Sequence, residues 1–132
     1  MYSFLTQEDY DRLLANGKEQ EALSERDEWK DHVPVVLLSL RETGCRWLLT
    51  EVSPDDPEIV FGLCDLGLGF PEQGSVSLTE LEDLRNPFGQ KVEREQSFRT
   101  DRSLGYFTDL AGKYRKIVLP EEIVASQMGR ER

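Results

Sequence analysis

The chain has 132 residues, of which 38% are hydrophobic and 32% are charged, so it can bury one core and is too apolar to be a disordered chain. Its 26 acidic and 16 basic side chains give a formal net charge of −10, which opposes direct binding to nucleic acid or to anionic membranes. No apolar run approaches the length of a membrane span, and the first residues do not resemble a signal peptide, so we expect a cytoplasmic protein that does not bind membranes.

We expect a single domain over residues 1–132, because the chain is close to the usual size of one domain and no internal repeat divides it. Within it we distinguish a helical N-terminal segment (6–31), a sheet-and-helix body (33–98) and a mildly basic C-terminal extension (99–132). Acidic residues outnumber basic residues in the first two parts, and the reverse holds in the extension.

The N-terminal segment carries signals for a helix over residues 7–16. The sequence from Thr6 to Asp9 is typical of a helix start, and apolar side chains such as Leu13 recur on one face of the helix that follows. Gly17 can adopt the left-handed conformation that ends many helices, so we expect the helix to stop there. Residues 18–31 are rich in charge, which favours a short second helix and an exposed linker.

The body alternates between strand and helix signals. Runs of β-branched and apolar residues predict strands over residues 33–40, 45–52 and 59–66, a short edge strand over 74–76 and a further strand within 90–98. Ser77, followed by leucines at helical spacing, predicts a helix over residues 77–85. We therefore expect an α+β fold, with a mainly antiparallel sheet of four or five strands and helices packed on one face. Its core is expected to include Val35, Leu37, Leu48, Val60, Phe61, Leu63, Leu78, Leu81 and Leu84.

Short motifs in residues 33–98 resemble the family called domain of unknown function 2958, small proteins of plasmids, conjugative elements and phages. They are Trp47, Thr50-Glu51, Phe61-Gly62-Leu63, Gly69, Pro71-Glu72-Gln73-Gly74, Ser77-Leu78-Thr79-Glu80-Leu81, Gly89 and Val92-Glu93-Arg94. The chain departs from the family pattern at Ser75-Val76, where the family has an aromatic pair, and at Arg94-Glu95, where it favours Arg-Asp. The resemblance implies the context of a mobile genetic element and no particular reaction.

The helical segment ends in an acidic face next to a tryptophan. The candidate binding residues are Glu19, Glu21, Glu25, Asp27 and Glu28, with Trp29 as a candidate interface anchor because tryptophan is enriched at protein interfaces. Such a face could imitate the phosphates of DNA and bind a protein, such as a nucleic-acid enzyme of the host or of the element. The favoured hypothesis is a non-enzymatic accessory protein of a mobile genetic element that acts by protein–protein binding, one form of it being an acidic DNA mimic that inhibits a host defence nuclease. A plainer interpretation is that these charges only keep the protein soluble.

The alternative hypothesis is a metal-dependent enzyme. Carboxylates are good ligands for divalent cations, and Glu51, Asp65 and Glu72 would lie on the predicted sheet, although their spacing does not require them to meet. The favoured hypothesis needs no catalytic residue and no cofactor. His32 is the only histidine and is expected in an exposed linker, while Cys45 and Cys64 are expected to be reduced thiols in the core.

Overall fold

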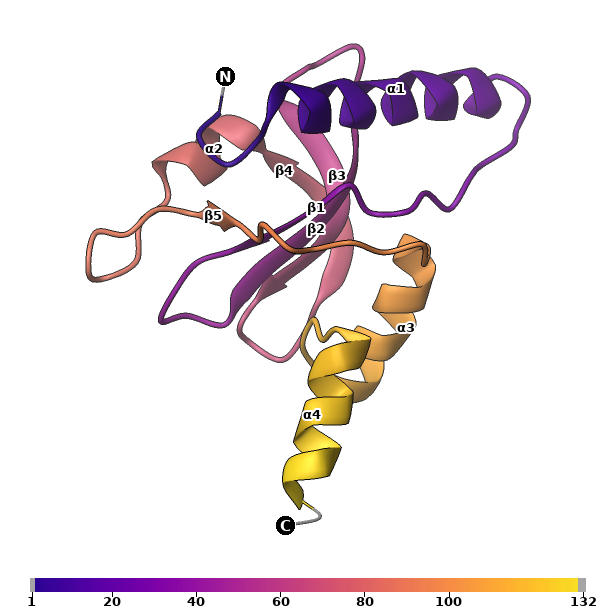
Figure 1. The fold of residues 1–132 in the computed structure, drawn as a ribbon. Helices are drawn as coiled ribbons and strands as arrows, with labels where there is room; N and C mark the ends of the chain where they lie inside the picture. Colours follow the sequence, from indigo (N-terminus) through magenta and orange to yellow (C-terminus); the bar gives the residue numbers. More distant parts are fainter. Residues whose placement is uncertain (1, 131–132) are drawn as a thin grey trace.

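The computed structural model describes residues 2–130 as a five-stranded antiparallel sheet with four helices (Figure 1). The strands are β1 (Val36–Ser39), β2 (Cys45–Val52), β3 (Ile59–Leu66), β4 (Glu72–Ser77) and β5 (Glu93–Arg94). The helices are α1 (Gln7–Ser24), α2 (Leu78–Asp83), α3 (Leu104–Tyr114) and α4 (Pro120–Arg130). The strand order is β4-β3-β2-β1-β5, which confirms the predicted α+β class and the antiparallel sheet.

Helix α1 is longer than predicted because Gly17 does not end it. The helix starts as expected, with the Thr6 hydroxyl accepting from the Asp9 amide and the Asp9 carboxylate accepting from the Thr6 amide. It then continues through Gly17, where a Cβ atom would lie 1.8 Å from the Val52 carbonyl oxygen. Glycine is therefore used here for a close approach of the helix to β2, and the predicted break at this residue is wrong.

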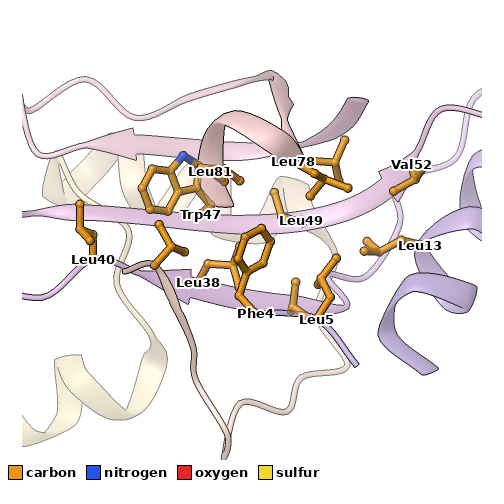
Figure 2. Close-up of a cluster of buried hydrophobic side chains, with 13 residues drawn as sticks. Phe4, Leu5, Leu13, Leu38, Leu40, Trp47, Leu49, Val52, Leu78 and Leu81 are labelled. Atoms are coloured by element: carbon orange, nitrogen blue, oxygen red, sulfur yellow. The ribbon is translucent and has the colours of Figure 1, made fainter. Parts of the chain in front are cut away.

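Apolar residues alternate between the two faces of the sheet, and each face has its own core. On one face Val36, Leu38, Trp47 and Leu49 pack with residues of α1, α2 and the N-terminal segment, as Figure 2 shows around Trp47. On the other face Leu37, Leu48 and Leu63 pack with Leu104, Phe107 and Ala111 of α3. The helices thus cover both faces, whereas one covered face was expected, because the extension after residue 98 supplies apolar residues of its own.

The two edge strands and β1 occur where strands are predicted, but their lengths differ from the prediction. β4 forms one edge through pairs from Ile59↔Ser77 to Cys64↔Glu72, and the two-residue β5 forms the other edge beside β1. β1 begins at Val36, three residues later than predicted. Pro34 lies in the omitted part of the predicted strand and has no amide hydrogen to donate to a neighbouring strand. Ser77 caps α2 by accepting from the Glu80 amide at 3.2 Å, as expected.

The C-terminal extension forms α3 and α4 (Figure 1). α3 packs on the sheet, and the connection after it is anchored by Ile117, Val118 and Leu119, which are all buried. α4 projects from this connection beyond the end of the sheet (Figure 1). Among residues 2–130, no helix is both long enough and apolar enough to cross a membrane.

Candidate functional site

Trp29 is the large aromatic side chain that the fold leaves most open to a partner near the acidic face. Its exposed fraction is 61%, although the next residue, Lys30, donates its amide to the Gln20 side chain of α1 at 2.9 Å. Trp29 lines a surface hollow of about 390 Å³ together with the apolar side chains of Pro54, Ile59 and Phe61. A rigid aromatic beside an apolar floor can bury much surface at low cost in side-chain entropy, so Trp29 has the features of an interface anchor.

The five predicted acidic residues are all exposed, but they do not form one continuous face. Glu19 does not line the hollow, and its carboxylate accepts from Lys30 at 3.3 Å and lies 2.7 Å from the His32 ring. Glu28 lies 3.5 Å from the Arg26 guanidinium, so its charge is partly balanced. Of the remaining three, Glu21 and Glu25 are one turn apart at the end of α1, and Asp27 lies in the turn that follows. Only Glu21 among the five lines the hollow.

Asp55 completes the acidic surface beside Trp29, and the sequence analysis did not identify it. It lies in the turn between β2 and β3, 34 residues after Glu21, and lines the same hollow. The charge of Asp55 raises the pKa of Glu21, with smaller contributions from desolvation, from a hydrogen bond to Asp55 and from the charge of Glu25. The negative charges of Glu21 and Asp55 therefore repel each other, and a cation from a partner would offset this repulsion. We call Trp29, Glu21 and Asp55 the Trp29 surface.

His32 is buried, and the prediction of an exposed linker histidine is wrong. Its Nε2 atom lies 2.7 Å from a Glu19 oxygen, and its Nδ1 atom lies 3.3 Å from the Gln20 side-chain nitrogen and 3.6 Å from a Glu51 oxygen. The His32 carbonyl also accepts from the Leu104 amide at 2.9 Å. These contacts connect α1, β2 and α3, which explains why a polar side chain is buried at this position.

The three carboxylates of the metal hypothesis lie in different surroundings. Glu51 pairs opposite Phe61, four residues from Asp65 on β3, which places the two about 13 Å apart along the strand. Asp65 is buried and accepts from the amides of Gly67 and Ile117, at 2.8 and 2.9 Å. Glu72 is exposed on the edge strand β4. Within residues 2–130, no three His, Cys, Asp or Glu side chains are grouped so that they could hold a metal ion.

The comparisons with known proteins agree with the resemblance seen in the sequence. A family model described as "Protein of unknown function (DUF2958)" matches residues 4–118, which adds α1 and α3 to the region that carried the resemblance. No curated protein and no solved structure matches the chain. The match covers most of the 132 residues, and the chain therefore belongs to the DUF2958 family of proteins of unknown function.

Proposed function

We propose that this protein is a non-enzymatic accessory protein of a mobile genetic element, and that it acts by binding another protein at the Trp29 surface. The observation that carries this proposal is the exposed Trp29 ring, which shares a hollow with two carboxylates that repel each other. The occupant that fits is a basic segment of a partner. An arginine or lysine can stack on the ring of Trp29 and pair with Glu21 and Asp55 at the same time.

The net charge of the whole chain favours the same class of partner. A formal charge of −10 attracts basic surfaces over distances of about one Debye length, which speeds encounter with DNA-binding proteins and repels nucleic acid itself. The partner is therefore a protein with a basic binding face, such as a nucleic-acid enzyme of the host. In that case the acidic surface occupies the place of DNA and inhibits the enzyme, for which a host defence nuclease is the expected target.

The test is an affinity capture from lysate of the native host with tagged full-length protein, read by mass spectrometry at low and high salt. The wild type is expected to retain a basic, nucleic-acid-binding protein in stoichiometric amount, and this capture should weaken as salt rises. The double variant Glu21→Lys, Asp55→Lys should lose roughly 90% or more of the captured protein, and so should Trp29→Ala, because a few residues at the centre of an interface supply most of its binding energy.

Folding does not confound this test. Replacing Glu21 alone by lysine places a cation beside Asp55, so the thermal stability of Glu21→Lys should equal or exceed that of the wild type while its capture falls. A matched control reverses two exposed carboxylates elsewhere, Asp83→Lys and Asp101→Lys, and should leave capture unchanged. If the control loses as much captured protein as the Glu21, Asp55 variant, the partner recognises only the net charge of the protein, and the proposal of a specific Trp29 surface is contradicted.

A further inference from the structure

A second hollow, about 820 Å³ in volume, lies at the other end of the molecule from the Trp29 surface. It forms where the connection between α3 and α4 passes the turn between β1 and β2 and the end of β3. This volume is within the usual range for sites that bind small molecules. The hollow shares no lining residue with the Trp29 surface, so what it binds is independent of the proposed function.

The wall of this hollow is held in place by buried groups. The Asp65 carboxylate, which is 1% exposed, accepts from the Gly67 amide at the end of β3 and from the Ile117 amide in the α3–α4 connection. Ile117 and Val118 are themselves buried. The two residues just before them, Arg115 and Lys116, are exposed and line the hollow, so their cationic side chains are carried on a backbone that is anchored at its next two residues.

The hollow is basic although the protein is acidic. Its lining includes four cationic side chains, Arg41, Arg46, Arg115 and Lys116, and two carboxylates, Asp65 and Glu122. Arg46 is paired with Glu122 at 2.9 Å, and Arg41 is paired with Glu93 at 3.0 Å. Among the side chains of residues 2–128, neither Arg115 nor Lys116 has a carboxylate partner within ion-pair distance. Two cations are thus available to a ligand.

One anionic group of the protein already lies in this wall. The Glu122 carboxylate accepts two bonds from the Arg46 guanidinium, at 2.9 and 3.2 Å, and one from the Leu119 amide at 2.9 Å. Burial alone would raise the pKa of Glu122, but these hydrogen bonds and the charges of Arg46 and Lys116 outweigh it and hold the pKa below its usual value. The surroundings of the hollow therefore stabilise negatively charged oxygen atoms.

We propose that this hollow binds a small molecule bearing a phosphate or carboxylate group, whose oxygens pair with Arg115 and Lys116. The rest of the ligand lies against the apolar and aromatic side chains of the lining, which are Leu40, Tyr114, Val118 and Ile123. The cations can pair with the anionic group itself, which pyrophosphate or citrate supplies, and the apolar side chains can bury the organic part of a larger ligand.

The test measures the melting temperature of the full chain with pyrophosphate and, separately, with citrate, at an ionic strength kept constant with sodium chloride. A saturable rise of about 5 °C is expected with at least one probe, because a ligand that binds only the folded state stabilises it. A rise with pyrophosphate alone assigns the site to phosphates, a rise with citrate alone assigns it to carboxylates, and a rise with both assigns it to either group.

Variants separate the site from general charge effects. Arg115→Gly removes a cation at a residue with φ of +60°, a conformation that glycine adopts freely, so the fold is retained. Combined with Lys116→Gln, it should weaken the affinity for the active probe at least about 10-fold. Lys18→Gln removes one exposed cation on α1 and should leave the affinity unchanged. No saturable rise with either probe, or the same rise in the double variant and the wild type, would overturn the proposal.

Discussion

Asp9 and Arg94 form a two-bond ion pair that joins the first turn of α1 to the short edge strand β5. The Asp9 oxygens accept from the guanidinium at 2.6 and 3.1 Å, and the Asp9 side chain is only 6% exposed. The same carboxylate accepts from the Thr6 amide and so also closes the N-terminal capping box of α1. One side chain therefore holds both the start of the helix and the edge of the sheet, 85 residues apart.

This pair predicts a loss of stability in acid. Burial alone would raise the pKa of Asp9, but the hydrogen bonds from Arg94 and Thr6 and the charge of Arg94 outweigh it, so the pKa lies below its usual value. A carboxyl group with a lowered folded-state pKa stabilises the protein fully above its unfolded pKa of about 3.9, and this contribution is lost as pH falls through the folded value. Asp9→Asn should cost about 2 kcal/mol at pH 7 in urea unfolding, because it leaves Arg94 without its anion.

The difference in unfolding free energy between wild type and Asp9→Asn should shrink between about pH 5 and pH 2, where the wild-type carboxylate is protonated. Asp11→Asn is the matched control, since Asp11 is exposed on the same helix and its carboxylate accepts from the Gln7 side chain at 2.8 Å. Its effect should stay within about 0.5 kcal/mol at every pH. A constant Asp9→Asn difference from pH 7 to pH 2 would contradict the assignment.

The approach of α1 to β2 makes a second prediction. Gly17→Ala should destabilise the protein by at least about 2 kcal/mol, because the added methyl group would lie 1.8 Å from the Val52 carbonyl oxygen and the helix would have to move. Gly112→Ala is the control: it lies in α3, has no atom within 4 Å of the added methyl group, and should stabilise by up to about 1 kcal/mol. Thermal or urea unfolding measures both changes. A neutral Gly17→Ala would mean that α1 does not lie against β2 in solution.

Local sequence patterns predict the elements that depend on neighbouring residues, but not those that depend on contacts between distant residues. Elements with a local signal were found: the Thr6 and Ser77 caps, and the apolar runs that form β2 and β3. The helix end predicted at Gly17 is wrong because the role of this glycine depends on Val52, 35 positions away, and no local pattern indicates that contact. Leu84, expected in the core, is 37% exposed because α2 ends one residue before it.

The candidate site was predicted only in part, for the same reason. Residue type alone predicts Trp29 and Glu21, and both line the exposed hollow. No local pattern indicates Asp55, because only the turn between β2 and β3 brings it to the helix end. The sequence predicts His32 in solvent because the residues before it are charged, whereas Glu19 and Gln20 supply the hydrogen bonds that permit its burial, and a Glu51 oxygen lies 3.6 Å from its ring.

Cys45 and Cys64, which were expected in the core, are both half-buried at its margin, and Cys64 makes a third prediction, on thiol reactivity. Cys64 faces Trp47 across β2 and β3, and burial raises the pKa of its thiol to about 11. Since the thiolate is the reactive form, Cys64 should react with iodoacetamide about 100-fold more slowly than a free thiol at pH 8, where almost none of it is ionised.

The measurement is the labelling rate in a Cys45→Ser variant, in which Cys64 is the only thiol. The rate should keep rising with pH beyond pH 9, and a plateau near pH 9 would show that the thiol is solvated. Labelling that is much faster in urea at pH 8 would agree with the half-buried position, because unfolding returns the pKa to the range of an exposed cysteine.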